Sequence, residues 1–141
     1  MTTDMQPLLL DTHAAIWITR DEPLAPRATE AVNAAHQAAG MVFVSAITAW
    51  EVGLLVSRNR LKLLMTPQRW FARLLDVPGI SLAELSPGIL IASSFLPGEP
   101  PRDPADRILL ATARDLGATL ITRDRLLLKY GEDSEVSTIA C

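Results

Sequence analysis

The chain has 141 residues, of which 49% are hydrophobic, and a formal net charge of −3. This length suits one domain, and the apolar content excludes a disordered chain. The net charge excludes a strongly basic nucleic-acid binder, but not an enzyme that meets phosphates through metal ions and a few arginines.

The cysteine content and the hydrophobic pattern indicate where the protein works. The single cysteine, Cys141, cannot form an intrachain disulfide, which favours a reducing compartment. The apolar stretch at residues 46–56 is too short to span a bilayer and contains Glu51, and the N-terminus lacks the pattern of a signal peptide. We therefore expect a cytoplasmic protein with no membrane segment. We also expect a single domain over residues 1–141, with a flexible tail at about residues 1–6.

Five short apolar runs predict strands. The first, at residues 8–10, consists of three leucines and ends at Asp11. Continuous runs of this kind are typical of strands that are buried on both faces. The other predicted strands follow in chain order at residues 41–44, 80–85, 119–122 and about 136–139.

Helical patterns separate these runs. Ser45 and Thr66 suit N-caps, and Gly40 and Gly117 suit the position after a last helical turn. The predicted helices, in chain order, cover residues 12–19, 26–39, 46–57, 67–75, 87 to before 96, 103–116 and 124–130. This alternation predicts an α/β fold in which helices cover both faces of a mainly parallel sheet.

Several acids fall where a parallel sheet binds ligands. Asp11 ends the first strand, and Asp124 lies two residues beyond the fourth. Ligands of open parallel sheets bind outside the carboxyl ends of the strands, so we expect both acids at one edge. Asp103 suits the N-cap of the helix before the fourth strand, which leaves Asp106, at N3, free for another role.

Glu51 is the only charged residue between residues 43 and 58. It shares a helical face with Ile47, Trp50 and Leu54, where a carboxylate is costly unless it is paired, protonated or bound to a metal. A buried structural acid and a metal ligand both remain open at this point, just as Asp11 and Asp124 could be simple helix caps.

The four acids Asp11, Glu51, Asp106 and Asp124 would repel one another without a cation. Their oxygen ligands suit Mg²⁺ or Mn²⁺ better than zinc. His13 could approach the same place, but a lone histidine is more often structural. The three tryptophans lie in apolar stretches and are expected in the core or in an interface.

The motifs resemble those of the PIN-domain family, and more narrowly of VapC-type toxins of bacterial and archaeal toxin–antitoxin pairs. They occur in the family's order and cover nearly the whole chain, as LLDT at residues 9–12, SAITAWEV at 45–52, DPADRILLATA at 103–113 and LITRD at 120–124. The resemblance implies a PIN-like three-layer α/β/α fold and a ribonuclease activity that depends on Mg²⁺ or Mn²⁺.

The resemblance also implies the roles of individual residues. The metal-binding and catalytic acids would be Asp11, Glu51, Asp106 and Asp124, with Asp103 in support. Residues that would assist the acids or contact the substrate are Thr12, Ser45, Thr122, Arg102, Arg107 and Arg123.

The family implies an RNA substrate, a homodimer and a cognate VapB-type antitoxin whose C-terminal segment covers the acidic crevice. The sequence leaves open which RNA is cut, whether DNA is also cut, whether one or two ions bind, the class of antitoxin and the size of the assembly. A basic segment could steer RNA, dock a partner or simply be solvated, and comprises Arg58, Arg60, Lys62, Arg69 and Arg73.

Two other enzyme classes also place an aspartate after a first buried strand. A HAD-like phosphatase usually has a second aspartate where this chain has His13. A receiver domain needs a lysine at the end of a strand near its C-terminus, whereas Lys129 of this chain falls in a predicted helix. Both alternatives therefore fit poorly. A catalytically silent PIN-type binding module is the remaining alternative, and the presence of all four acids argues against it.

Overall fold

A five-stranded parallel sheet forms the centre of the computed structural model, which describes residues 6–20, 25–37 and 41–141. The spatial order of the strands is β3-β2-β1-β4-β5, and every neighbouring pair is parallel. The strands are β1 (Leu8–Leu10), β2 (Val42–Ser45), β3 (Ile80–Ala83), β4 (Thr119–Thr122) and β5 (Thr138–Ala140).

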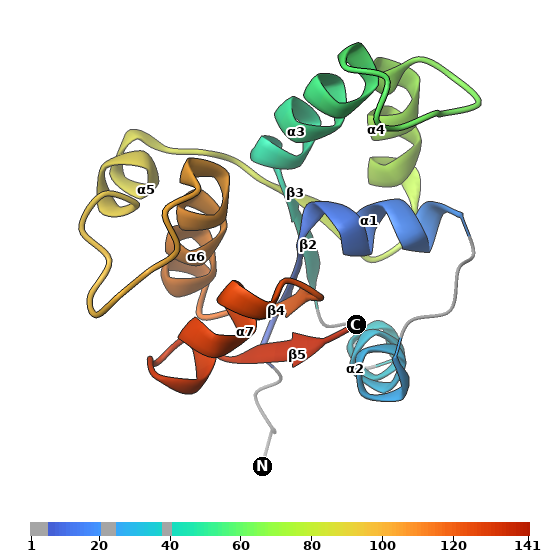
Figure 1. The fold of residues 1–141 in the computed structure, drawn as a ribbon. Coiled ribbons are helices and arrows are strands. Elements are labelled where there is room, and N and C mark those ends of the chain that lie inside the picture. The colour runs from blue at the N-terminus through green and yellow to red at the C-terminus, as the bar shows by residue number, and fades with distance from the viewer. Residues whose placement is uncertain (1–5, 21–24, 38–40) are drawn as a thin grey trace.

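Helices cover both faces of this sheet. Figure 1 shows α1 and α2 on one side and α5 and α6 on the other, which confirms the predicted three-layer α/β/α class. The helices are α1 (Thr12–Thr19), α2 (Pro26–Gln37), α3 (Ala46–Ser57), α4 (Pro67–Asp76), α5 (Pro87–Ala92), α6 (Pro104–Leu116) and α7 (Arg125–Glu132). Among the described residues, no helix combines the length and the apolar character needed to cross a bilayer.

The central strand β1 divides the interior into two cores. Leu8 and Leu10 pack with α1, α2 and α4, whereas Leu9 packs with α5, α6 and α7. All three leucines are buried, and alternate side chains of a strand point to opposite faces. Burial on both faces therefore explains why the run is apolar at every position.

The predicted elements differ from the observed ones mainly at their ends. Strand β3 stops at Ala83, although the apolar pattern continues to Leu85. Strand β5 begins two residues later than predicted, because Val136 is buried in the core beside α6 and does not pair in the sheet. An apolar pattern reports burial and not strand pairing. Residues 1–5 of the tail predicted at about residues 1–6, and the cap at Gly40, lie outside the described residues. Gln6 itself accepts a 2.8 Å hydrogen bond from the Thr119 hydroxyl.

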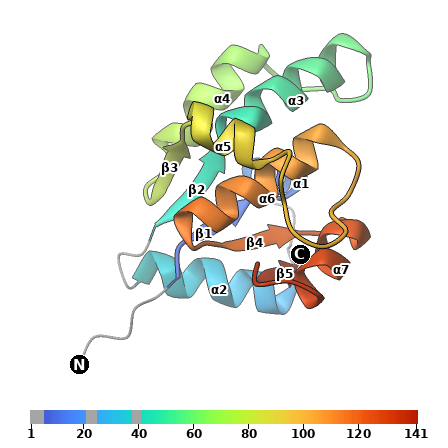
Figure 2. The same cartoon turned by 90° about the vertical axis from the view of Figure 1, so that its left-hand side faces the viewer.

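The long loop between α5 and α6 is attached to α7. The Tyr130 hydroxyl donates a 2.6 Å hydrogen bond to the carbonyl oxygen of Pro97, and Figure 2 shows the loop reaching toward α7. Arg107 Nε donates another 2.6 Å hydrogen bond to the carbonyl oxygen of Pro101. These two bonds fix the approach to α6 and thereby position the acids of its first turn.

Two glycines inside helices are expected to respond oppositely to alanine. A Cβ at Gly131 would lie 2.5 Å from side-chain atoms of Thr138, whereas a Cβ at Gly53 would meet no atom within 4 Å. We expect Gly53→Ala to raise the free energy of unfolding by up to about 1 kcal/mol through helix propensity. Gly131→Ala should lower it by roughly 1–3 kcal/mol because the site is overpacked.

Urea unfolding of both variants measures these changes. The double variant Gly131→Ala with Thr138→Ala serves as the control, since it relieves the clash and should recover part of the loss. A Gly131→Ala protein as stable as the wild type would show that α7 and β5 do not approach this closely.

Candidate active site

Three helices begin at the same place, and each begins with an aspartate. Asp11 caps α1, Asp103 caps α6 and Asp124 caps α7. Each carboxylate accepts a 2.8 Å hydrogen bond from a main-chain N–H in the first turn of its helix. Because β1 and β4 are parallel neighbours, Asp11 and Asp124 follow them at the same edge of the sheet, as predicted.

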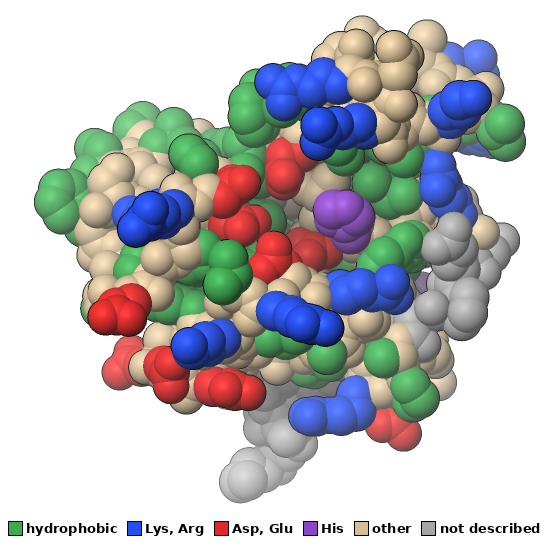
Figure 3. Space-filling model, in the orientation of Figure 1, with side chains coloured by type: hydrophobic (Ala, Val, Ile, Leu, Met, Phe, Trp, Pro, Cys, Tyr) green, Lys and Arg blue, Asp and Glu red, His purple; other side chains and the backbone are tan. Residues whose placement is uncertain are grey.

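A crevice of about 350 Å³ lies at this edge and collects the acids. Figure 3 shows acidic side chains gathered in a hollow in the middle of this face of the molecule. The acids that line the crevice are Asp11, Glu51, Asp103, Asp106 and Asp124, and the other lining residues are Thr12, His13, Trp17, Leu109 and Arg123. The four acids proposed from the sequence are therefore neighbours in space, and Asp103 joins them.

Thr122 links the two acids that follow the strands. Its hydroxyl donates a 2.5 Å hydrogen bond to Asp11 Oδ2 and accepts a 3.0 Å hydrogen bond from the main-chain N–H of Asp124. Burial raises the pKa of Asp11 above its ordinary value, although the hydrogen bonds from Thr122 and from the main chain of Ala14 act in the opposite direction. A buried carboxylate is therefore held in one orientation at the floor of the crevice.

Glu51 reaches the crevice from α3. The Thr12 hydroxyl donates a 2.6 Å hydrogen bond to Glu51 Oε1 and lies 3.1 Å from the hydroxyl of Thr48. Burial raises the pKa of Glu51, with further contributions from the negative charges of Asp103 and Asp11. The predicted apolar face around Glu51 is only partly buried: Ile47 is in the core, whereas Trp50 is 58% exposed and so is not the core residue that its apolar neighbours suggested.

Asp106 experiences the strongest effect of its neighbours. Burial raises its pKa to about 7, and the charges of Asp124, Asp103, Glu51 and Asp11 all act in the same direction. Each of these four charges is negative and makes the charged form of Asp106 less favourable. A cation in the crevice would remove this penalty.

The donor set fits a hard divalent cation. The acids offer only carboxylate oxygens, which suit Mg²⁺ or Mn²⁺. Burial raises the pKa of Asp11, Glu51 and Asp106, and the charges of neighbouring acids add to this effect. Within the ranges that the structure describes, no three Asp, Glu, His or Cys side chains converge closely enough to hold an ion as they stand. Binding would therefore require the carboxylates to draw together around the ion.

Four residues proposed from the sequence do not line the crevice, although one of them, Thr122, contacts Asp11. Ser45 is buried and caps α3, because its hydroxyl accepts a hydrogen bond from the main-chain N–H of Ile47. Arg107 holds the loop at Pro101, and Arg102 is exposed beside that loop. Of the three arginines proposed to contact substrate, the crevice contains Arg123.

The structure places two residues of α1 in the crevice besides the acids. His13 is exposed and lines it, in agreement with the sequence, which allowed His13 to approach this place. Trp17 is half-buried and packs against the core, as predicted, but it also lines the crevice, a role that the sequence analysis did not give it. The spacing carried the signal, since residues four apart share a helical face.

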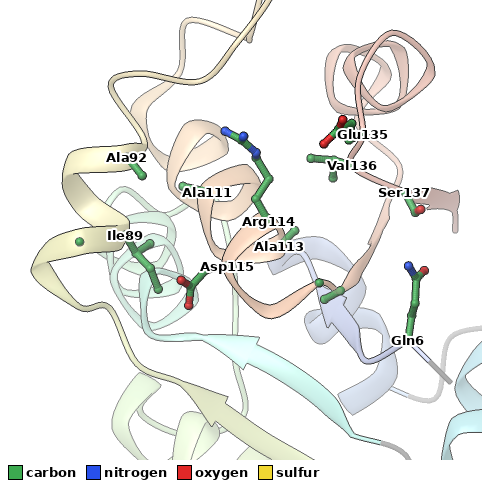
Figure 4. A pocket seen from close by; sticks show the side chains of 13 residues that line it. Gln6, Ile89, Ala92, Ala111, Ala113, Arg114, Asp115, Glu135, Val136 and Ser137 are labelled. Carbon is green, nitrogen blue, oxygen red and sulfur yellow. The ribbon is translucent and has the colours of Figure 1, made fainter. Parts of the chain in front are cut away.

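A second pocket, of about 440 Å³, lies elsewhere and does not extend this site. Gln6, Gly117 and Ser137 line it, and they precede β1, β4 and β5, so it lies at the amino edge of the sheet. Figure 4 shows the side chains of Arg114 and Asp115 pointing in different directions. The pocket therefore offers no convergent set of charges.

Comparisons with known proteins agree with this geometry. The family model described as PIN domain matches residues 8–133. Ribonuclease VapC22 of Mycobacterium tuberculosis is 32% identical over 127 residues, which cover 89% of this chain and 93% of that protein.

Solved structures share the fold at lower identity. One is a chain in the structure of VapBC2 from Rickettsia felis bound to a DNA fragment from its promoter. It is 15% identical to this chain with a TM-score of 0.66, and the match covers 96% of this chain and 98% of that one. FitAcB from Neisseria gonorrhoeae gives 21% identity and a TM-score of 0.56, covering 94% and 96%.

The raised pKa of Asp106, about 7, predicts how stability changes with pH when no divalent cation is present. The folded protein binds this proton more tightly than the unfolded chain, so the free energy of unfolding should rise as pH falls from 8 to 6. Asp106→Asn should raise the free energy of unfolding at pH 8 and weaken its pH dependence. Urea unfolding in EDTA measures both effects. An Asp106→Asn protein less stable than the wild type at pH 8 would contradict this electrostatic description.

Proposed function

This chain belongs to the PIN-domain family, and on that premise we propose that it is a VapC-type toxin that hydrolyses RNA at the acidic crevice. The observation that carries the proposal is the convergence of five carboxylates from four places in the chain, three of them with raised pKa values. Capping alone does not require this convergence, because a capped helix can begin anywhere on a surface. Glu51 in particular caps no helix.

We assign the metal to Asp11, Glu51, Asp106 and Asp124. Mg²⁺ or Mn²⁺ bound there would lower the pKa of a water molecule and offset the negative charge that develops on the phosphate oxygens. The PIN-type motifs in which these four acids stand imply the same assignment.

The neighbouring residues prepare this site. Thr122 and Thr12 donate hydrogen bonds that hold Asp11 and Glu51 in fixed orientations. The amino ends of α1, α6 and α7 face the crevice, and the positive ends of their dipoles offset part of the negative charge that the acids and a phosphate bring there. Asp103, which already serves α6 as its cap, adds negative charge at the rim and supports the cation indirectly.

The partners follow from the same family membership. We propose a VapB-type antitoxin as the regulator, which is supported by the fold shared with the VapBC2 complex from Rickettsia felis. We propose a homodimer because α5 and the residues after it expose apolar side chains, with Ile91 63% and Phe95 78% exposed. The exposed basic segment on α4 and the connection between α3 and α4 would steer the RNA backbone toward the crevice.

Substitution of the acids tests the proposed activity. Wild-type protein should cut RNA with Mg²⁺ or Mn²⁺ and not in EDTA. Asp124→Asn and Glu51→Gln should each lower kcat/KM by at least about a hundredfold, because a bound metal ion supplies several kcal/mol of charge stabilisation. The asparagine retains the helix cap, so the loss would report the charge and not the fold.

Two further variants control this experiment. Asp115→Asn removes an exposed acid of α6 outside the crevice and should leave cleavage unchanged. Asp103→Asn should lose less than about tenfold, since it retains its cap and supports the cation only indirectly. Folded wild-type protein that binds Mn²⁺ but cuts no RNA would leave the catalytically silent binding module as the better description.

A further inference from the structure

We propose that one wall of the crevice binds an unpaired base of the RNA beside the phosphate that is cut. This wall, which we call the aromatic ledge, consists of His13, Trp17 and Arg123. The inference rests on the proposed ribonuclease function and goes beyond it, because it assigns a substrate-binding surface that the acids do not provide.

The ledge is built from two segments. His13 and Trp17 are four residues apart on α1, and their rings lie 6.1 Å apart between centroids at an angle of 52°. Arg123, between β4 and α7, places its guanidinium carbon 3.5 Å from the centroid of the Trp17 ring. An indole ring and a guanidinium group are thus stacked at the side of the crevice, with the histidine next to them.

Arg123 does not pair with the acids although it lines the same crevice. Among the described residues, its contacts are the Trp17 ring and the main-chain oxygen of Cys141, which accepts a 3.3 Å hydrogen bond from Arg123 Nε. A guanidinium free to move would be drawn to the carboxylates. The contact with the ring and the hydrogen bond instead hold it over the tryptophan and leave the carboxylates available to a cation.

The chemistry of the ledge suits a base. Unpaired bases stack on aromatic rings and on guanidinium planes in RNA complexes, and this stacking tolerates any base because every base has a π-face. A base is uncharged, so the acids on the other walls do not repel it as they repel a phosphate. The scissile phosphate would lie at the acids and their cation, with the adjoining base on the ledge.

This arrangement predicts that the enzyme cuts where the RNA is single-stranded, because a base inside a duplex cannot leave its neighbours without an energetic cost. If Arg123 instead contacted only a phosphate, removal of a base from the RNA would not change how the enzyme binds it. The two possibilities therefore differ in a measurable way.

The test uses short oligoribonucleotides with one mapped cleavage site, in which the nucleotides on either side are replaced one at a time by an abasic nucleotide. The proteins compared are the wild type, Trp17→Leu, Trp17→Phe and Arg123→Gln. Trp50→Leu is the matched control, since Trp50 is 58% exposed and does not line the crevice. KM and kcat are measured for each combination.

For the wild type, one abasic position should raise KM by about five- to a hundredfold, the range expected for the loss of one stacked base. The same abasic change should have little further effect in Trp17→Leu and a reduced effect in Arg123→Gln. Trp17→Phe should keep much of the wild-type response because it keeps a π-face, and Trp50→Leu should keep all of it.

A structural role for Trp17 would lower activity equally on intact and abasic substrates. If Trp17→Leu and the wild type lose the same factor at every abasic position, the aromatic ledge does not bind a base. That result differs from failure of the proposed function, in which the wild type would cut no RNA of either kind.

Discussion

The mutual repulsion of carboxylates at one edge of the sheet is the constraint on which the site depends. Asp11, Asp103 and Asp124 cannot withdraw from it, because each accepts hydrogen bonds from the N–H groups that begin a helix. The helix dipoles offset part of the repulsion, typically by about 0.3–1 kcal/mol for each acid. Part of it remains: burial raises the pKa of Asp106 to about 7, and the charges of the neighbouring acids act in the same direction. The fold therefore holds negative charge in place for a cation.

The same polar groups serve the fold and the site. Thr122, for example, ends the buried strand β4, orients Asp11 and accepts a hydrogen bond from the main chain that leads into α7. A parallel sheet allows the same residues to serve both purposes, because the carboxyl ends of its strands and the amino ends of the following helices meet at one edge. The aromatic ledge completes the crevice with a wall that carries no acid.

The sequence predicted the fold class and most element positions because the strands are buried on both faces and the helices carry clear caps. It also predicted that Asp11 and Asp124 meet, since that follows from strand direction alone. It also predicted Ser45 as the N-cap of α3, which the structure confirms. From motif position it placed Ser45, Arg102 and Arg107 near the acids as well, whereas none of the three lines the crevice and Arg107 holds a loop. Side-chain direction in loops depends on packing that no spacing reveals.

The stacked pair of Trp17 and Arg123 could not be predicted for a related reason. The two residues are far apart in sequence, and their contact requires the approach of α1 to the turn after β4. The metal-ligand roles of the acids stay a prediction. The structure describes how the carboxylates converge, and their affinity for an ion is a separate quantity.

Binding of Mn²⁺, followed by loss of the electron paramagnetic resonance signal of the free ion, tests the central claim most directly. The account predicts that wild-type protein takes up Mn²⁺ at pH 8, that Glu51→Gln and Asp106→Asn weaken the binding strongly, and that Asp115→Asn does not. It also predicts weaker binding at pH 5.5, where Asp106 with its raised pKa of about 7 is protonated. A folded wild-type protein that binds no Mn²⁺ at pH 8, or equal binding by all four proteins, would contradict the claim that the crevice is built to hold a cation.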